Sequence, residues 1–229
     1  MRDRVQHLPH RLALRGRGYA AAVAATDRFL PQADETVTEH VVVAADSTLT
    51  YAAIGRADIS SDRFVGIVGG LDDARVRLAG ESPAPRTLDR LLAADVGPVE
   101  LSAEPGVRRV IGVAGHYDAA KRGVAHLRAE DFDAFDAPGS LKAVVEFTLT
   151  PQDGGRTLLG CEVRVSATDE DMRSTLGMTW FAVRIGLGLA VRRLLAAIRA
   201  EAEGGLGAEP AQDSDTDGDH DDAGDLHPA

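Results

Sequence analysis

Lys142-Ala-Val-Val-Glu-Phe-Thr-Leu-Thr150 and Thr157-Leu-Leu-Gly-Cys-Glu-Val-Arg-Val-Ser-Ala167 are the two stretches that decide the fold of this chain. In both, apolar side chains return at every second position, which is the pattern of an antiparallel strand with one buried face. The connection between them contains Asp153-Gly154-Gly155, residues that tolerate the positive φ angles of a tight turn. The sequence therefore predicts a β-hairpin.

A long amphipathic helix is predicted directly after this hairpin. Thr168 is a suitable N-cap, and the three acidic residues that follow it suit the unpaired amides of a first turn. Gly186 and Gly188 weaken a helix and predict a bend. Apolar residues recur at steps of three and four, as they do along one face of a helix: Met172, Leu176, Thr179/Trp180, Val183, Leu187, Val191, Leu194/Leu195, Ile198 and Ala202.

The chain before the hairpin reads as short helices and further antiparallel strands. Pro105-Gly106 marks a turn between two of these strands. The expected elements are a strand over 35–43, a helix from Asp46 or Ser47 to about Gly55, a second short helix over 60–71, a helical turn over 87–94, strands over 96–103 and 107–117, a short strand over 124–127 and a helical turn over 131–135.

Several local motifs in this order carry a family resemblance: Ala-Glu-Pro-Gly (103–106), Val-Ile-Gly-Val-Ala-Gly (110–115), Asp-Phe-Asp-Ala-Phe-Asp-Ala-Pro-Gly (131–139), Glu-Val-Arg-Val-Ser-Ala-Thr-Asp (162–169) and Val-Arg-Arg-Leu-Leu-Ala-Ala-Ile (191–198). Through them the chain resembles an uncharacterised bacterial branch of the START-like superfamily, also called SRPBCC, which includes polyketide cyclases, lipid-transfer domains and the birch-pollen allergen. The resemblance implies an α+β helix-grip fold: a curved antiparallel sheet with two short helices and a long C-terminal helix packed across it. It implies less about chemistry, because this scaffold hosts carriers, receptors and enzymes.

Three segments follow from the resemblance and from the composition. Residues 1–29 are an arginine-rich extension, 30–203 the START-like domain, and 204–229 an acidic tail that we expect to be disordered. The tail holds eight of the acidic residues and no Lys or Arg, so it accounts for most of the net charge of −11. The remaining domain is nearly neutral and has no basic stripe, which argues against nucleic acid as a ligand.

Cys161 is the only cysteine, which excludes an intrachain disulfide and a cysteine-based metal site and favours a cytoplasmic location. The uncharged run Ser174–Val183 is too short to span a bilayer, so we expect no integral membrane association. The tail segment from Asp213 resembles a calcium loop, but it has Gly224 where the bidentate Glu belongs. No metal or other cofactor is therefore predicted.

The leading functional prediction is that a hydrophobic small molecule or lipid binds between the sheet and the long helix, because inward strand positions must face the apolar stripe. The predicted lining is Phe147, Leu149, Cys161, Val163, Trp180, Val183 and Leu187.

Two alternatives stay open. In the first, the chain is a cyclase- or dehydratase-like enzyme that uses His116 or Tyr117, because strand alternation turns one of the two toward the cavity and a proton-transfer group must reach the substrate. In the second, it is a scaffold that binds proteins through its acidic tail.

Glu146, Glu162 and Arg164 fall on the polar faces of their strands, where cross-strand ion pairing is expected. The oligomeric state is left open.

Overall fold

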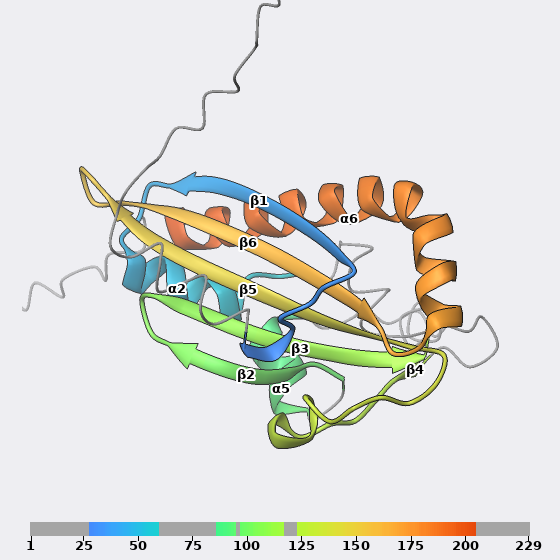
Figure 1. Ribbon diagram of the computed structural model, residues 1–229. Coiled ribbons are helices and arrows are strands. Elements are labelled where there is room, and N and C mark those ends of the chain that lie inside the picture. The colour runs from blue at the N-terminus through green and yellow to red at the C-terminus, as the bar shows by residue number, and fades with distance from the viewer. Residues whose placement is uncertain (1–27, 60–85, 95–96, 117–122, 205–229) are drawn as a thin grey trace, which may run out of the picture.

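The computed structural model describes residues 28–59, 86–94, 97–116 and 123–204. These residues form one curved antiparallel sheet with the strand order β1-β6-β5-β3-β2, and β4 pairs with β3 (Figure 1). The strands are β1 (Glu35–Val43), β2 (Val99–Glu104), β3 (Arg108–His116), β4 (Gly123–Val124), β5 (Ser140–Gln152) and β6 (Arg156–Ala167).

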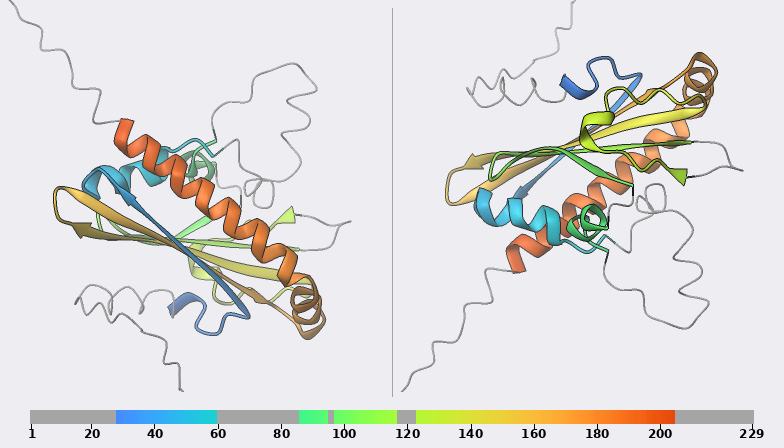
Figure 2. Two further views of the ribbon diagram at one scale, coloured as in Figure 1. Left: turned by 90° about the horizontal axis from the view of Figure 1, so that it is seen from above. Right: turned by 90° about the horizontal axis from the view of Figure 1, so that it is seen from below.

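The helices gather on one face of this sheet. Figure 2 shows α2 (Ser47–Arg56), α5 (Leu88–Ala93) and the long α6 (Glu170–Gly204) on one side of the strands. The 3-10 turn η1 (Ala129–Asp131) and the segment that begins at Arg28 lie on the other side. The sheet with a long helix across it is the helix-grip fold, so the α+β fold class predicted from the sequence is confirmed.

The predicted hairpin forms, and it is longer than expected. Strands β5 and β6 stay in register from Leu141 opposite Ala167 to Gln152 opposite Arg156. Gly154 and Gly155 take φ angles of 73° and 68°, which are costly for any residue with a Cβ atom. The two glycines therefore allow the tight connection that brings the strands back together.

Aspartate side chains cap the starts of α2 and α6. Asp46 accepts hydrogen bonds from the amides of Thr48 and Leu49, as predicted for the start of α2. Thr168 is not the cap of α6, because Asp169 accepts the hydrogen bond from the Met172 amide, over 2.7 Å. The Thr168 hydroxyl instead donates to the backbone carbonyls of Ala137 and Ser140, at the start of β5.

Other predicted boundaries shift by a few residues. The helical turn expected over 131–135 is η1, which starts two residues earlier, and the short strand expected over 124–127 is β4 at Gly123–Val124. Tyr117, the helix expected over 60–71, residues 1–27 and the tail after Gly204 lie outside the described residues.

The sheet has a hydrophobic core on each face. The larger core joins the sheet to α2 and α6 and includes Phe147, Leu159 and Val191. The second core lies on the opposite face, where Phe132 is fully buried against Val110 and Val144. Its members also include Leu30 and Phe29, so the polypeptide before β1 belongs to the packed domain. Residue 29, assigned from the sequence to the extension, thus contacts the fold.

Helix α6 buries the stripe that its sequence predicts. Its buried residues are Leu176, Trp180, Leu187, Ala190, Val191, Leu194, Leu195, Ile198 and Ala202. The helix is continuous from Glu170 to Gly204 and changes direction along its course: its first turns run along the end of the sheet, and the rest crosses the strands (Figure 1). This path places the stripe over the larger core.

Candidate ligand-binding site

The predicted floor of the site lies on the face of the sheet that meets α6. Phe147 stands opposite Cys161 in the β5–β6 register, and Val163 stands opposite Val145. Phe147, Cys161 and Val163, together with Leu149, are at most 5% exposed and belong to the core on the helix side. The alternation of each strand therefore brings these four side chains to one surface.

The predicted roof comes from α6. Trp180 and Leu187 are buried in the same core, whereas Val183, between them on the stripe, is only half-buried. The structure thus brings all seven predicted lining residues into one apolar layer between sheet and helix. Val183 is also less completely covered than Trp180 and Leu187 on either side of it.

A patch of the floor is incompletely covered as well. Leu141 and Ala143 of β5 are half-buried and face the helix side, and Val113 stands opposite Ala143 in the register of β3 and β5. They lie toward the end of the sheet where α6 begins, because Leu141 pairs with Ala167. An apolar surface that is only partly covered is where a hydrophobic ligand gains the most from burial.

Cys161 cannot serve as a nucleophile in this surrounding. The thiol is 1% exposed, and burial, followed by the nearby carboxylate of Glu162, raises its pKa well above the usual value. A thiol needs to ionise to attack a substrate or to bind a metal. Cys161 therefore acts as a small apolar side chain in the floor, as the sequence predicts.

A polar cluster borders this floor at the β2–β3 side. The Arg109 guanidinium donates to Glu100 Oε2 over 2.7 Å and to Asp89 Oδ1 over 2.8 Å, and its side chain is 11% exposed. Arg109 stands opposite Phe147, so both side chains point to the helix side. Tyr51 of α2 interacts electrostatically with Arg109, Glu100 and Asp89. The cluster therefore joins four elements, α2, α5, β2 and β3.

The charges of this cluster are well defined. Burial alone would lower the pKa of Arg109, but its hydrogen bonds to Asp89 and Glu100 raise it above the usual value. Burial raises the pKa of the Tyr51 hydroxyl, so tyrosine stays protonated. A cation held by two carboxylates beside a neutral phenol offers hydrogen bonds without a net positive charge, which suits the hydroxyl or carbonyl of a ligand better than an anionic group.

Helices α2 and α5 lie close together, and this contact holds Asp89 in the cluster. A Cβ atom at Gly55 of α2 would overlap the Asp89 carboxylate, so the glycine allows α5 to reach Arg109. This cluster was not predicted from the sequence, although the alternation of β3 contains a signal for it: Arg109 shares its face with Ile111, a core residue. Its acidic neighbours lie 9 and 20 positions before it, on β2 and α5, and strand alternation alone does not bring the three groups together.

His116 lies on the other face of the sheet. It alternates with Val110 and Ala114, which belong to the core away from α6, and its Nδ1 is 3.0 Å from the hydroxyl oxygen of Ser140. His116 is exposed, whereas Ser140 is fully buried. The structure therefore does not bring His116 together with the seven lining residues. Tyr117, the other candidate of the enzyme alternative, is outside the described residues.

Charged side chains on the polar faces of β5 and β6 also pair within one strand. Arg164 donates to Glu162, two positions away on β6, over 2.6 Å. Glu146 is 2% exposed and stands opposite Glu162.

A shallow groove of about 340 Å³ lies between β1 and the C-terminal half of α6. The seven predicted lining residues do not border it; its walls are His40, Val41, Arg192, Leu195, Ala196, Arg199, Ala200 and Glu203. Arg192 is bound to Glu39 and Arg199 to Glu203, so the charges at its rim are already paired.

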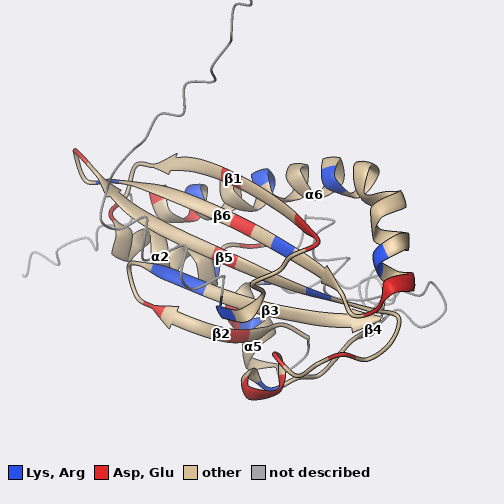
Figure 3. Cartoon of the chain, viewed as in Figure 1, with Lys and Arg blue, Asp and Glu red and all other residues tan. Residues whose placement is uncertain are grey.

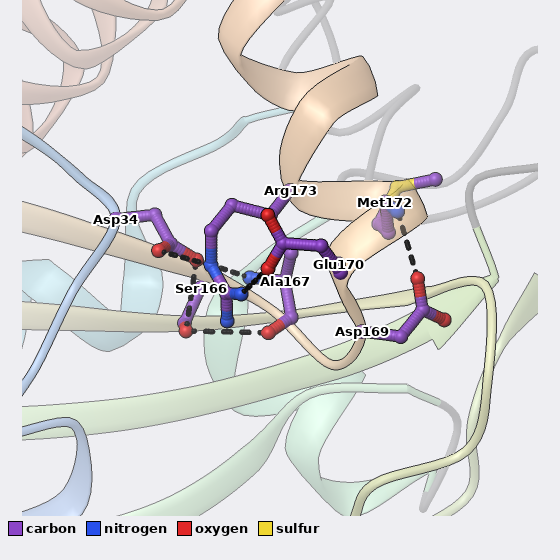
Figure 4. A network of polar contacts seen from close by, with 7 residues as sticks. All are labelled: Asp34, Ser166, Ala167, Asp169, Glu170, Met172 and Arg173. Carbon is purple, nitrogen blue, oxygen red and sulfur yellow. Dashed lines mark hydrogen bonds and ion pairs between the residues drawn. The ribbon is translucent and has the colours of Figure 1, made fainter.

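The corner between β6 and α6 is fixed by carboxylates (Figure 4). Asp34 accepts hydrogen bonds from the Ala167 amide and the Ser166 hydroxyl, and Arg173 of α6 donates to its other oxygen over 2.9 Å. Burial would raise the pKa of Asp34, but these hydrogen bonds lower it below the usual value. The first turn of α6 is thereby tied to the segment before β1, which sets where the helix starts over the floor.

Two absences concern only the part of the chain that the structure describes. Within residues 28–59, 86–94, 97–116 and 123–204, no three His, Cys, Asp or Glu side chains gather in a way that could hold a metal ion. Among the helices within these ranges, none has the length and apolar character needed to cross a membrane.

No family model matches the sequence, and no curated protein matches it. Solved structures with similarity include protein MLL2253 from Mesorhizobium loti, at 14% identity and a TM-score of 0.38 over 74% of this chain and 98% of that one. The Zhui aromatase/cyclase from Streptomyces sp. R1128 aligns at 15% identity and a TM-score of 0.30 over 76% of this chain and 96% of that one. TTHA0849 from Thermus thermophilus aligns at 12% identity and a TM-score of 0.33 over 75% of this chain and 99% of that one. The chain's own strand order and its long C-terminal helix give it the helix-grip fold.

Proposed function

We propose that the protein binds a hydrophobic small molecule or lipid between its curved sheet and α6. The observation that carries the proposal is the half-buried state of Val183, Leu141 and Ala143, which belong to the apolar layer that otherwise buries its members. A ligand that covers these side chains gains the free energy of burying apolar surface, about 25 cal/mol per Å².

The polar cluster supports a more specific form of this proposal. Arg109, Glu100 and Asp89 lie beside the apolar floor and carry one positive and two negative charges. A mainly apolar ligand with a hydroxyl or carbonyl at one end would find a hydrogen-bonding group there and an apolar surface elsewhere. Sites for small molecules commonly combine a few fixed polar groups with an apolar wall.

The test is native mass spectrometry of the full chain with fatty acids, phospholipids and aromatic polyketides. The wild type should retain at least one apolar compound with a defined stoichiometry. Val183→Trp should lose it, because indole would fill the space under α6. The matched control is Val99→Trp, since Val99 is also a half-buried valine but packs in the core on the opposite face.

Melting temperatures of both variants show whether either one unfolds. Retention of no compound by the wild type, or equal retention by a folded Val183→Trp variant, would contradict the proposal.

A further inference from the structure

The outer face of α6 carries four exposed apolar side chains. Phe181 is 80% exposed, Met178 78%, Ile185 61% and Leu189 48%. Among the described residues, the only other exposed large hydrophobics are Val42 and Val107, which lie on or next to strands. Single exposed apolar residues are normal on a protein surface, but a contiguous group marks a binding surface.

These four residues form one stripe, here named the outer stripe. Each follows the previous one by three or four positions, which keeps them on one side of a helix. Leu187 of the buried stripe follows Ile185 by two positions, about 200° around the helix. Helix α6 therefore has two apolar faces, one packed on the sheet and one directed away from it.

The charges that α6 itself carries around the outer stripe have one sign. From Met172 to Ala200 the sequence contains five arginines and no Asp or Glu. Figure 3 shows basic positions along α6 after an acidic first turn. Arg173, Arg192 and Arg199 are held in ion pairs with acidic residues of β1, of the segment before it or of α6 itself.

Arg184 and Arg193 make no ion pair within the described part of the chain, and both are exposed. They lie on either side of the outer stripe, since Arg184 precedes Ile185 by one position and Arg193 follows Leu189 by four.

We infer that the outer stripe docks the protein on the surface of a lipid bilayer that contains anionic lipids. An apolar face with Phe, Met, Ile and Leu, flanked by arginines, is what an element lying in the membrane interface requires. The apolar side chains reach the acyl boundary, and Arg184 and Arg193 contact the anionic headgroups. Docking is a property of the outer face and is independent of what binds between the sheet and α6.

The charges disfavour a second copy of this chain as the occupant. A two-fold symmetric contact brings the same patch of both copies together. Arg184 and Arg193 would then face their own equivalents with no acidic residue between Met172 and Ala200 to compensate.

The acidic tail fits poorly as well, because it offers charge but little apolar surface. The helix from Leu189 to Gly204 spans about 22 Å. The point where the tail leaves α6 therefore lies more than two screening lengths of about 8 Å from the outer stripe at physiological salt.

Vesicle co-sedimentation of the full chain tests the inference. The wild type should pellet with vesicles of phosphatidylglycerol and phosphatidylcholine in equal amounts, and much less with phosphatidylcholine alone. Phe181→Ser with Ile185→Ser should reduce partitioning by about tenfold or more, because the apolar contact is lost. Arg184→Gln and Arg193→Gln should each reduce it by about fivefold, and raised salt should do the same.

Matched controls lie elsewhere on the surface. Val42→Ser with Val107→Ser removes two exposed apolar side chains, and Arg128→Gln removes an arginine that is 79% exposed, so both should leave partitioning unchanged. Val183→Trp, on the buried side of α6, should also pellet like the wild type. Lipid found with the protein in the supernatant would show uptake of a ligand by the protein, and it is not a measure of docking on the vesicle surface.

Three outcomes would overturn the inference. The first is a wild type that stays in the supernatant with anionic vesicles. The second is equal pelleting of the wild type and the Phe181→Ser, Ile185→Ser variant. The third is a dimer in sedimentation velocity that this variant abolishes, since a second copy would then be the occupant of the outer stripe.

Discussion

The carboxylate of Glu203, in the last turn of α6, accepts a hydrogen bond from the backbone amide of Ala44, just after β1, over 2.9 Å. Residues 159 positions apart in the sequence thereby join the end of the long helix to the edge strand. Arg199 donates to the same carboxylate over 2.8 Å. The helix is therefore fixed at both ends, here by Glu203 and at its start by Asp34 and Asp169, and its stripe has one position over the sheet.

Replacing Glu203 by Gln should lower the melting temperature at neutral pH and weaken its dependence on acid. The hydrogen bond from Ala44, followed by Arg199, lowers the pKa of Glu203 below 4.5. A lowered carboxyl pKa stabilises the folded state above about pH 4.5, and this stabilisation is lost as pH falls through the folded-state pKa. Thermal melts between neutral and acidic pH measure the effect.

Glu201→Gln is the control for this experiment, since among the described residues Glu201 pairs only with the exposed Arg56. Equal melting curves of the two variants at every pH would show that the Glu203 contact adds nothing to stability.

Two glycine substitutions should act in opposite directions. A Cβ atom at Gly112 would lie 2.8 Å from the ring of Phe132, which is fully buried, so Gly112→Ala should destabilise the protein by about 1–3 kcal/mol through overpacking. A Cβ atom at Gly177 of α6 meets nothing within 4 Å, so Gly177→Ala should stabilise by about 0.5–1 kcal/mol. Urea unfolding measures both, and a stabilised Gly112→Ala variant would show that Phe132 moves at little cost.

Cys161 should not react with a thiol reagent in the folded protein. Burial raises its pKa, so the thiolate that reacts is scarce at about pH 8, and the side chain is 1% exposed. Labelling with 5,5′-dithiobis-(2-nitrobenzoic acid) should follow global unfolding, with one thiol released in denaturant. Rapid labelling in native buffer would mean that the floor of the site opens without unfolding.

A chain trimmed to residues 28–204 should melt within a few degrees of the full protein. We expect the packed domain to lie within residues 28–204, with the basic extension and the acidic tail outside it. A second chain that starts at Glu35 should melt at a clearly lower temperature, because it lacks Phe29, Leu30 and Asp34, which contact the sheet and α6. Similar melting of these two chains would show that the segment before β1 contributes little.

The sequence alone determined the elements whose signals are local. The alternation of Thr157–Ala167, the glycines of the turn and the step of three and four along α6 each depend on neighbours within a few positions, and each is found in the structure. The predicted floor and roof residues also come together, because alternation and helical period fix which face a side chain occupies once the fold is known.

Tertiary structure alone decided what depends on distant residues. Thr168 and Asp169 are both good caps, and the amide of Gly139, which donates to Asp169, favours the second. The Arg109 cluster unites residues from α5, β2 and β3, and the core around Phe132 covers a face of the sheet that its strand pattern alone predicts to be polar. Phe181 and Ile185 belong to an exposed stripe because the sheet occupies only one side of α6. Local periodicity predicts which residues share a face of a helix or strand. The packing of the whole chain decides which of these faces are buried by other elements.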